Sequence, residues 1–354
     1  MRKLYLHIGS MKTGTTTLQK FLSVNRQTLI NKGLRYPGKG LEHHSLITYF
    51  QEDAAKLPRL YRHFSAEKIA AIRDRAIKAL TEELENSSEH IIISSEYLGH
   101  ADQALIAKIQ SFFSTYFDEI IAIYFVRDPV GLYQSLTQQG LKASSNIRPP
   151  AQFKYRFRET IEAWASLFPI KVLGHDRRHD VVESFCNTLP LNVQDFTRID
   201  RQNETMPIEK MKLLEKLQAQ LYPDQQNRLK PHFRSLIHKV YETGHPPRLK
   251  PEAAKIIYQN HQSNYLWLKN EYGIEFARAC EAQDLKPEWL EKFSGNLTLE
   301  DVFQSDTKAQ ELFELEVINT ILKSNRKLRL KNQRLEKMKL RTFLKNKIMA
   351  YLSP

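Results

Sequence analysis

Short apolar runs recur along the N-terminal half of the chain, and helical spacing of apolar positions separates them. Runs rich in β-branched residues predict β-strands, and they occupy Leu4–Ile8, Leu34–Tyr36, His90–Ser94, Ile120–Val126 and Ile170–Leu173. Residues 67–84 and 105–116 place their apolar side chains on one helical face. Strands that alternate with helices are typical of a parallel sheet covered by helices.

The strand pattern fades after about residue 205, and helical segments interrupted by proline and glycine follow. The basic residues then concentrate near the C-terminus. We therefore expect an α/β core over residues 1–200, a helical region over 201–322 that completes the domain, and a basic amphipathic helical tail over 323–354.

The 354-residue chain is 41% hydrophobic and 26% charged, which indicates a globular protein. Its two cysteines, Cys186 and Cys280, fit neither a disulfide scaffold nor a metal knuckle. No run of about 18 apolar residues could span a membrane, and the first residues lack the apolar stretch of a signal peptide. These features predict a cytoplasmic protein.

Most of the net charge of +13 lies in one short segment. Residues 323–347 contain eleven basic residues and one acidic residue, so the rest of the chain is nearly neutral. A nucleic-acid-binding domain usually spreads positive charge over its folded surface, and we therefore expect no nucleic-acid partner. The tail carries a thin apolar stripe at Ile321, Leu328, Leu335 and Met338. This pattern suits the anionic surface of a membrane; the alternatives are packing on the body, a short dimer contact and an acidic polymer.

A glycine-bearing turn follows the first predicted strand and precedes a helical stretch. Its sequence is Gly9-Ser10-Met11-Lys12-Thr13-Gly14-Thr15-Thr16-Thr17. A turn of this kind directs backbone N–H groups and a helix N-terminus at one point, which suits a phosphate. The glycine spacing matches a Walker loop, but threonine stands where the Walker lysine would follow Gly14. The fold class predicted is therefore α/β, a P-loop-like parallel sheet flanked by helices, with a mostly helical C-terminal region.

The segment Lys12-Thr13-Gly14-Thr15-Thr16 resembles the 5′-phosphosulfate loop of sulfotransferases that use 3′-phosphoadenylyl sulfate (PAPS). A second element, Arg127-Asp128-Pro129 with Ser135 eight residues after the arginine, resembles the 3′-phosphate-binding element of the same family. Farther on, Asn264-Tyr265-Leu266-Trp267-Leu268 is similar to the C-terminal half of bacterial carbohydrate sulfotransferase-like proteins.

The resemblance implies transfer of a sulfuryl group from PAPS, as co-substrate, to a hydroxyl or amine of an acceptor. A cation stabilises the negative charge that develops on the leaving phosphate, and the resemblance gives this role to Lys12. It implies no divalent metal ion. The residues that it assigns to PAPS binding are Lys12, Thr13, Gly14, Thr15, Thr16, Thr17, Arg127 and Ser135.

A sulfotransferase also needs a base that accepts the acceptor's proton, and a histidine or a carboxylate would serve. His43 and His44 follow the predicted second strand and its Pro37-Gly38 turn, and Glu96 follows the strand His90–Ser94. The sequence ranks His44 and Glu96 equally, with His43 behind them. A polar loop or a helix cap explains these residues as well.

The acceptor expected from the weaker resemblance is a carbohydrate or a glycolipid, held in a cleft walled by residues 201–322. A tail bound to a membrane would place the protein at the inner face of that membrane. The sequence is also compatible with an oligomer. Two alternatives remain open: a P-loop kinase acting on a small molecule, and a non-catalytic nucleotide-binding scaffold.

Overall fold

The computed structural model describes residues 1–58, 60–176, 180–199, 205–221 and 244–352. The chain divides into two compact units. The first comprises Met1–Leu136, Arg148–Glu204 and Pro251–Gly295, and the second comprises Thr137–Ile147, Thr205–Lys250 and Asn296–Pro354.

A five-stranded sheet forms the centre of the first unit. Its strands are β1 (Lys3–His7), β2 (Leu34–Arg35), β3 (His90–Ser94), β4 (Glu119–Arg127) and β5 (Ile170–His175). They lie in the order β2-β3-β1-β4-β5, and every neighbouring pair is parallel. The predicted strands and the predicted α/β class are thus confirmed, with strand ends shifted by a few residues.

The helices of the first unit connect and cover these strands. The α-helices are α1 (Thr15–Val24), α2 (Arg26–Asn31), α3 (Ile47–Phe50), α4 (Ala66–Glu85), α5 (Gln103–Phe113), α6 (Pro129–Gly140), α7 (Phe157–Ala165), α8 (Val181–Cys186), α11 (Pro251–Tyr272), α12 (Ala277–Cys280) and α13 (Pro287–Lys292). Short 3₁₀ turns are η1 (His44–Leu46), η2 (Ala54–Lys56), η3 (Glu96–His100), η4 (Pro150–Gln152) and η5 (Val193–Asp195). Helix α4 confirms the helical spacing over 67–84. Helix α5 confirms it from residue 105 but ends at Phe113, so Tyr116 lies in the turn beyond it. Helix α6 extends into the second unit.

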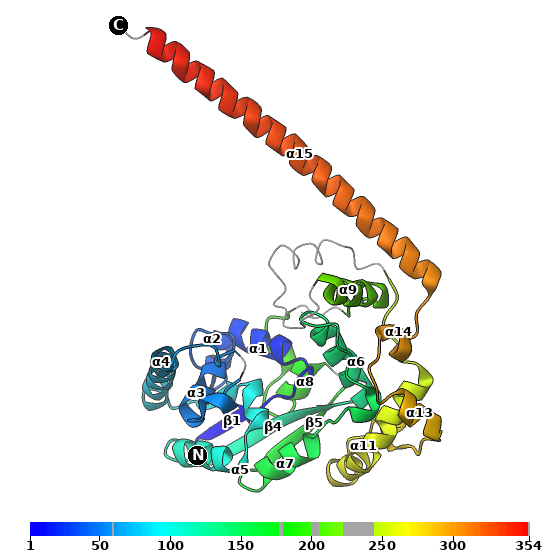
Figure 1. Cartoon of the computed structure of the whole chain (residues 1–354). Helices are drawn as coiled ribbons and strands as arrows, with labels where there is room; N and C mark the ends of the chain where they lie inside the picture. The colour runs from blue at the N-terminus through cyan, green and yellow to red at the C-terminus, as the bar shows by residue number, and fades with distance from the viewer. Residues whose placement is uncertain (59, 177–179, 200–204, 222–243, 353–354) are drawn as a thin grey trace. The chain divides into compact units, whose positions relative to one another are not determined.

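Alternate residues of β1, β3 and β4 enter opposite cores, as strand geometry requires. Leu4, Leu6 and Ile8 are buried in a cluster with side chains of α5, α7 and α11. Tyr5 and Phe125 lie in a second cluster, with side chains of α1 and α8. Figure 1 shows α1 and α8 on one side of the sheet, with α5 and α7 on the other. Burial of both faces explains why these strands are apolar almost without interruption.

Strand order reverses at β1, since the chain passes from β1 outward to β2 and later crosses from β3 to β4 on the other side. Open α/β sheets bind ligands at such a switch point, outside the carboxyl ends of the strands. His7 is paired with Ser94 of β3 and with Ile123 of β4. The segments that follow β1 and β3, together with the end of β4, therefore meet at one edge of the sheet.

The second unit is helical, with α9 (Ile208–Leu221), α14 (Leu299–Val302) and α15 (Thr307–Leu352). Phe313 and Val317 of α15 are buried against Leu213 of α9, with Ile321 packed beside them. Farther along α15, the predicted apolar stripe is exposed at Leu328, Leu335 and Met338. In the described part of the chain, no helix combines the length and the apolar character that crossing a membrane requires.

Candidate functional site

The loop between β1 and α1, residues 9–14, adopts a left-handed backbone at three positions. Gly9 has φ of 66°, Gly14 has φ of 81°, and Lys12 has φ of 64°. Among the described residues, Lys12 is the only residue other than glycine with a positive φ. A non-glycine residue pays about 1–2 kcal/mol for this conformation, and strain of this kind is concentrated at functional sites.

Gly9 has no room for a side chain, because a Cβ atom would lie 2.6 Å from the Cα atom of Glu96. We expect Gly9→Ala to lower the free energy of unfolding by about 2–5 kcal/mol, from left-handed strain and from overlap with the η3 backbone. Gly33→Ala is the matched control: its φ is 76°, but nothing lies within 4 Å of the added Cβ. Urea unfolding followed by tryptophan fluorescence measures both; equal losses would contradict the close approach.

The first turn of α1 leaves its backbone donors available. Gly14 is the N-cap residue and supplies no side-chain cap, while the first intrahelical bond runs from Leu18 N–H to the Gly14 carbonyl. The N–H groups of Thr15, Thr16 and Thr17 therefore have no partner within the helix. Such N–H groups, together with the positive end of the helix dipole, form an anion site.

The threonine hydroxyls of the loop divide into two groups. Those of Thr13 and Thr15 both donate to the Ser10 carbonyl, at 2.7 and 3.3 Å, and both side chains are buried. These two residues therefore shape the loop from inside. Thr17 is also buried, whereas Thr16 is exposed. Of the four hydroxyls, that of Thr16 is the one that reaches the surface.

Arg127 joins the two sequence motifs. Its guanidinium Nη1 donates to the Lys12 carbonyl at 2.6 Å, across 115 residues of sequence. The hydroxyl of Tyr265 on α11 donates in turn to the carbonyl of Arg127. Asp128 accepts from Gly131 N–H at 2.8 Å, so it caps the start of α6. Arg127 thus holds the strained loop residue at the carboxyl end of β4.

Ser135 lies on α6, half-buried, and its hydroxyl forms no hydrogen bond with any described residue. The structure therefore brings Arg127 into direct contact with the loop and leaves Ser135 outside that contact. Because Arg127 and Ser135 share no hydrogen bond, a phosphate held by both residues would need one contact with the guanidinium and another with the hydroxyl.

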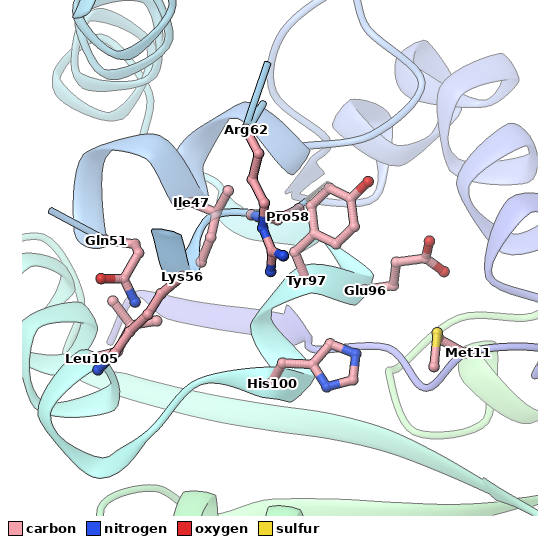
Figure 2. A pocket seen from close by; sticks show the side chains of 10 residues that line it. All are labelled: Met11, Ile47, Gln51, Lys56, Pro58, Arg62, Glu96, Tyr97, His100 and Leu105. Atoms are coloured by element: carbon pink, nitrogen blue, oxygen red, sulfur yellow. The ribbon is translucent and has the colours of Figure 1, made fainter. Parts of the chain in front are cut away.

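Glu96 is the first residue of η3, directly beyond β3, and it is half-buried. Burial raises the pKa of its carboxyl above the ordinary value; the Lys12 ammonium opposes this, and Glu42 adds to it. Its side chain lines a pocket of about 280 Å³, called here the η3 pocket, which also borders Met11 of the loop. Figure 2 shows Glu96 and Met11 together at one end of this pocket. Glu96 thus faces a cavity beside Lys12.

His43 has both ring nitrogens engaged by the backbone. Its Nδ1 accepts from Ser94 N–H at 3.1 Å, and its Nε2 donates to the Pro37 carbonyl at 3.0 Å. Burial lowers its pKa to about 4, so the ring is neutral at pH 7. A ring nitrogen in use cannot take up another proton, and the geometry suits His43 to positioning the segment before η1.

His44 is placed differently from its neighbour. Its Nδ1 lies 3.0 Å from the Ser95 hydroxyl, and its ring packs on Tyr97 with a centroid distance of 4.3 Å. Burial lowers its pKa to about 4. Its Nε2 has no hydrogen-bond partner among the residues that the structure describes, so His44 retains an available acceptor nitrogen when Nδ1 carries the proton.

The structure adds residues that the sequence did not single out. Tyr155 places its hydroxyl 3.0 Å from that of Ser10 in the loop, and Tyr265 contacts Arg127. His7 is buried beneath the site, where its Nδ1 lies 2.8 Å from the Ser94 hydroxyl, and burial lowers its pKa to about 3. These contacts join residues distant in sequence, and no local pattern marks them.

Comparisons with known protein families, with curated proteins and with solved structures found no match to this chain. Among the described residues, no group of three or more His, Cys, Asp or Glu side chains could hold a metal ion.

Proposed function

We propose that this protein is a sulfotransferase that moves a sulfuryl group from PAPS to a hydroxyl or amine of a carbohydrate or glycolipid acceptor. The observation that carries the proposal is the hydrogen bond from Arg127 to the Lys12 carbonyl. It unites the two motifs that resemble the family: the loop after β1, the strand at which the order reverses, and the end of the neighbouring strand β4.

The described residues fit a nucleotide with two separate phosphate groups. The uncapped start of α1 offers the N–H groups of Thr15, Thr16 and Thr17 to a 5′-phosphate. Arg127 lies at the end of β4, where its guanidinium suits a 3′-phosphate. Lys12 belongs to the same loop; its carbonyl accepts the hydrogen bond from Arg127, and its ammonium is close enough to Glu96 to oppose the rise in the pKa of that carboxyl. Its ammonium would stabilise charge on the leaving 5′-phosphate oxygen.

In the proposed transfer, the acceptor oxygen forms a bond to sulfur while the bond from sulfur to the 5′-phosphate oxygen breaks. The electron pair of the broken bond stays on the phosphate, and the acceptor's proton passes to a base. Glu96 suits this role best because its carboxylate lines the η3 pocket beside Lys12. His44, whose Nε2 is available, is the alternative.

Adenosine 3′,5′-bisphosphate (PAP), the product nucleotide, provides the direct test. At 100 times its Kd, PAP should stabilise the folded protein by about 2.7 kcal/mol, and 5′-AMP at the same concentration should stabilise it less. The thermal unfolding midpoint measures this effect. Stabilisation by ATP with Mg²⁺ in place of PAP would instead favour the small-molecule kinase, and no response to either nucleotide would favour a scaffold without nucleotide chemistry.

The proposed base gives the reaction an acid limit. The pKa of Glu96 is raised above the ordinary glutamate value of 4.5. As the pH drops through this raised pKa, the carboxylate becomes protonated and can no longer act as a base, so kcat/KM should fall. Glu96→Gln should lower kcat by about 10²–10⁴-fold and should also remove this acid limb of the pH profile. Glu42→Gln is the matched control, and it should keep the activity while moving the limb slightly lower, since the Glu42 charge raises the pKa of Glu96. An unchanged limb in Glu96→Gln would transfer the role to His44.

A further inference from the structure

The η3 pocket has a polarity that the proposed reaction alone does not explain. Glu96 and Met11 lie at one end, while Arg62 and Lys56 extend into its middle and far end (Figure 2). At about 280 Å³ it is at the lower limit of small-molecule sites and large enough for a single sugar ring with its substituents.

Arg62 reaches this pocket with its guanidinium held in place. Its Nε donates to the Leu57 carbonyl at 2.6 Å, and Leu57 is itself buried in the core. No described residue accepts a hydrogen bond from its two terminal amino groups. A guanidinium fixed through Nε presents these two groups as a fork, the geometry that binds carboxylate, phosphate or sulfate through two hydrogen bonds.

Lys56 ends η2 and adds a second positive charge. Its ammonium lies 3.4 Å from Asp102, but both side chains are more than half exposed, and an exposed pair of this kind is worth about 0–1 kcal/mol. Such a weak pair exchanges readily for a ligand anion. Among the side chains that line the pocket, two cations therefore face one carboxylate, Glu96, and this lining favours a negative ligand.

The walls of the pocket suit a ring-shaped ligand. The ring of Tyr97 borders it and packs on the ring of His44, with ring centroids 4.3 Å apart. Ile47 and Leu105 add apolar surface. A few charged groups on a mostly apolar wall orient a ligand as well as hold it.

We propose that the acceptor is an anionic saccharide, and that Arg62 and Lys56 bind its carboxylate or phosphate group while a sugar hydroxyl lies at Glu96. Identification of this ligand as the acceptor rests on the proposed sulfotransferase function; the anion preference of the pocket does not. Arg62 and Lys56 are then the residues that select the acceptor, since a neutral sugar offers no anionic group to either cation.

The test compares three sugars of similar size by ligand-observed NMR: glucose, glucuronate and glucose 6-phosphate, each with and without PAP. Both charged sugars should bind at least about tenfold more tightly than glucose, a difference of about 1.4 kcal/mol. The double variant Lys56→Gln/Arg62→Gln should bind all three as weakly as wild-type protein binds glucose. A preference for glucuronate alone, or for the phosphate alone, would identify the anion.

The control variant Arg278→Gln/Lys286→Gln removes the same charge from exposed positions of the first unit outside the pocket, and it should keep the preference. Equal affinity for all three sugars, no binding of any of them, or a preference that survives in the Lys56→Gln/Arg62→Gln variant would overturn the proposal. The PAP response is scored separately in the same samples. Charged sugars that bind protein unresponsive to PAP would leave the pocket assignment standing and remove the sulfotransferase.

Discussion

Replacement of Lys12 by alanine is expected to slow sulfuryl transfer by about 10²–10³-fold, the usual loss when one preplaced donor to developing charge is removed. Alanine at φ of 64° meets the same left-handed strain as lysine, so the fold should persist. The effect should appear in kcat more than in the Kd for PAP, because the charge that Lys12 is proposed to stabilise develops during the transfer. Initial rates of PAP release from PAPS, with an acceptor that wild-type protein sulfates, measure this loss.

Two further variants separate the Lys12 ammonium from its backbone. Lys12→Gly should be as inactive as Lys12→Ala yet fold at least as stably. Glycine avoids the left-handed strain of about 1–2 kcal/mol, and this gain exceeds the destabilisation of about 0.5–1 kcal/mol from its greater unfolded-chain entropy. Lys20→Ala removes a charge from α1 outside the loop and should retain full activity. Wild-type turnover by Lys12→Ala would remove the role assigned to this ammonium.

Replacement of Arg127 by alanine is expected to weaken PAP binding by about 10–100-fold, which corresponds to a hydrogen bond to a charged group of about 1.5–3 kcal/mol. The variant loses the cation that we propose for the 3′-phosphate and also the donor that holds the Lys12 carbonyl. The loop should therefore lose its position, and activity should fall further than the affinity alone predicts.

Selectivity for the 3′-phosphate distinguishes this role from a general structural one. In Arg127→Ala the Kd for PAP should approach that for 5′-AMP, whereas Arg127→Lys should keep part of the difference. Arg158→Ala, which breaks an exposed pair with Glu162 on α7, should leave both values unchanged. Calorimetric titration gives the two constants, and equal loss of PAP and 5′-AMP affinity in Arg127→Ala would count against a 3′-phosphate contact.

The sheet was predictable because both of its faces are buried. A strand covered on both sides is apolar at nearly every position, as in the run that became β4. The glycine turn and Arg127 were also predictable, because the turn directly follows such a strand and Arg127 is the last residue of another. Local sequence could not place Lys12 in a left-handed backbone, since the surroundings hold that conformation and glycine would adopt it more easily.

The sequence does not distinguish the roles of His43 and His44. The two are chemically identical neighbours in the sequence. In the fold, both ring nitrogens of His43 bond to the backbone, whereas His44 keeps its Nε2 available. The cations of the η3 pocket were missed for a similar reason. Lys56 and Arg62 lie in a polar segment without helical or strand periodicity, and the burial of Leu57 and Tyr61 determines where they lie.

The length of α15 affects how the stability of this protein must be measured. Its 46 residues correspond to about 69 Å of helix, while its described buried packing ends near Ile321. Beyond that point the helix depends on local propensity and should unravel as a separate unit. All three tryptophans, Trp164, Trp267 and Trp289, belong to the first unit. Circular dichroism and tryptophan fluorescence will therefore report different unfolding curves, and the fluorescence curve follows the unit that contains the loop and the η3 pocket.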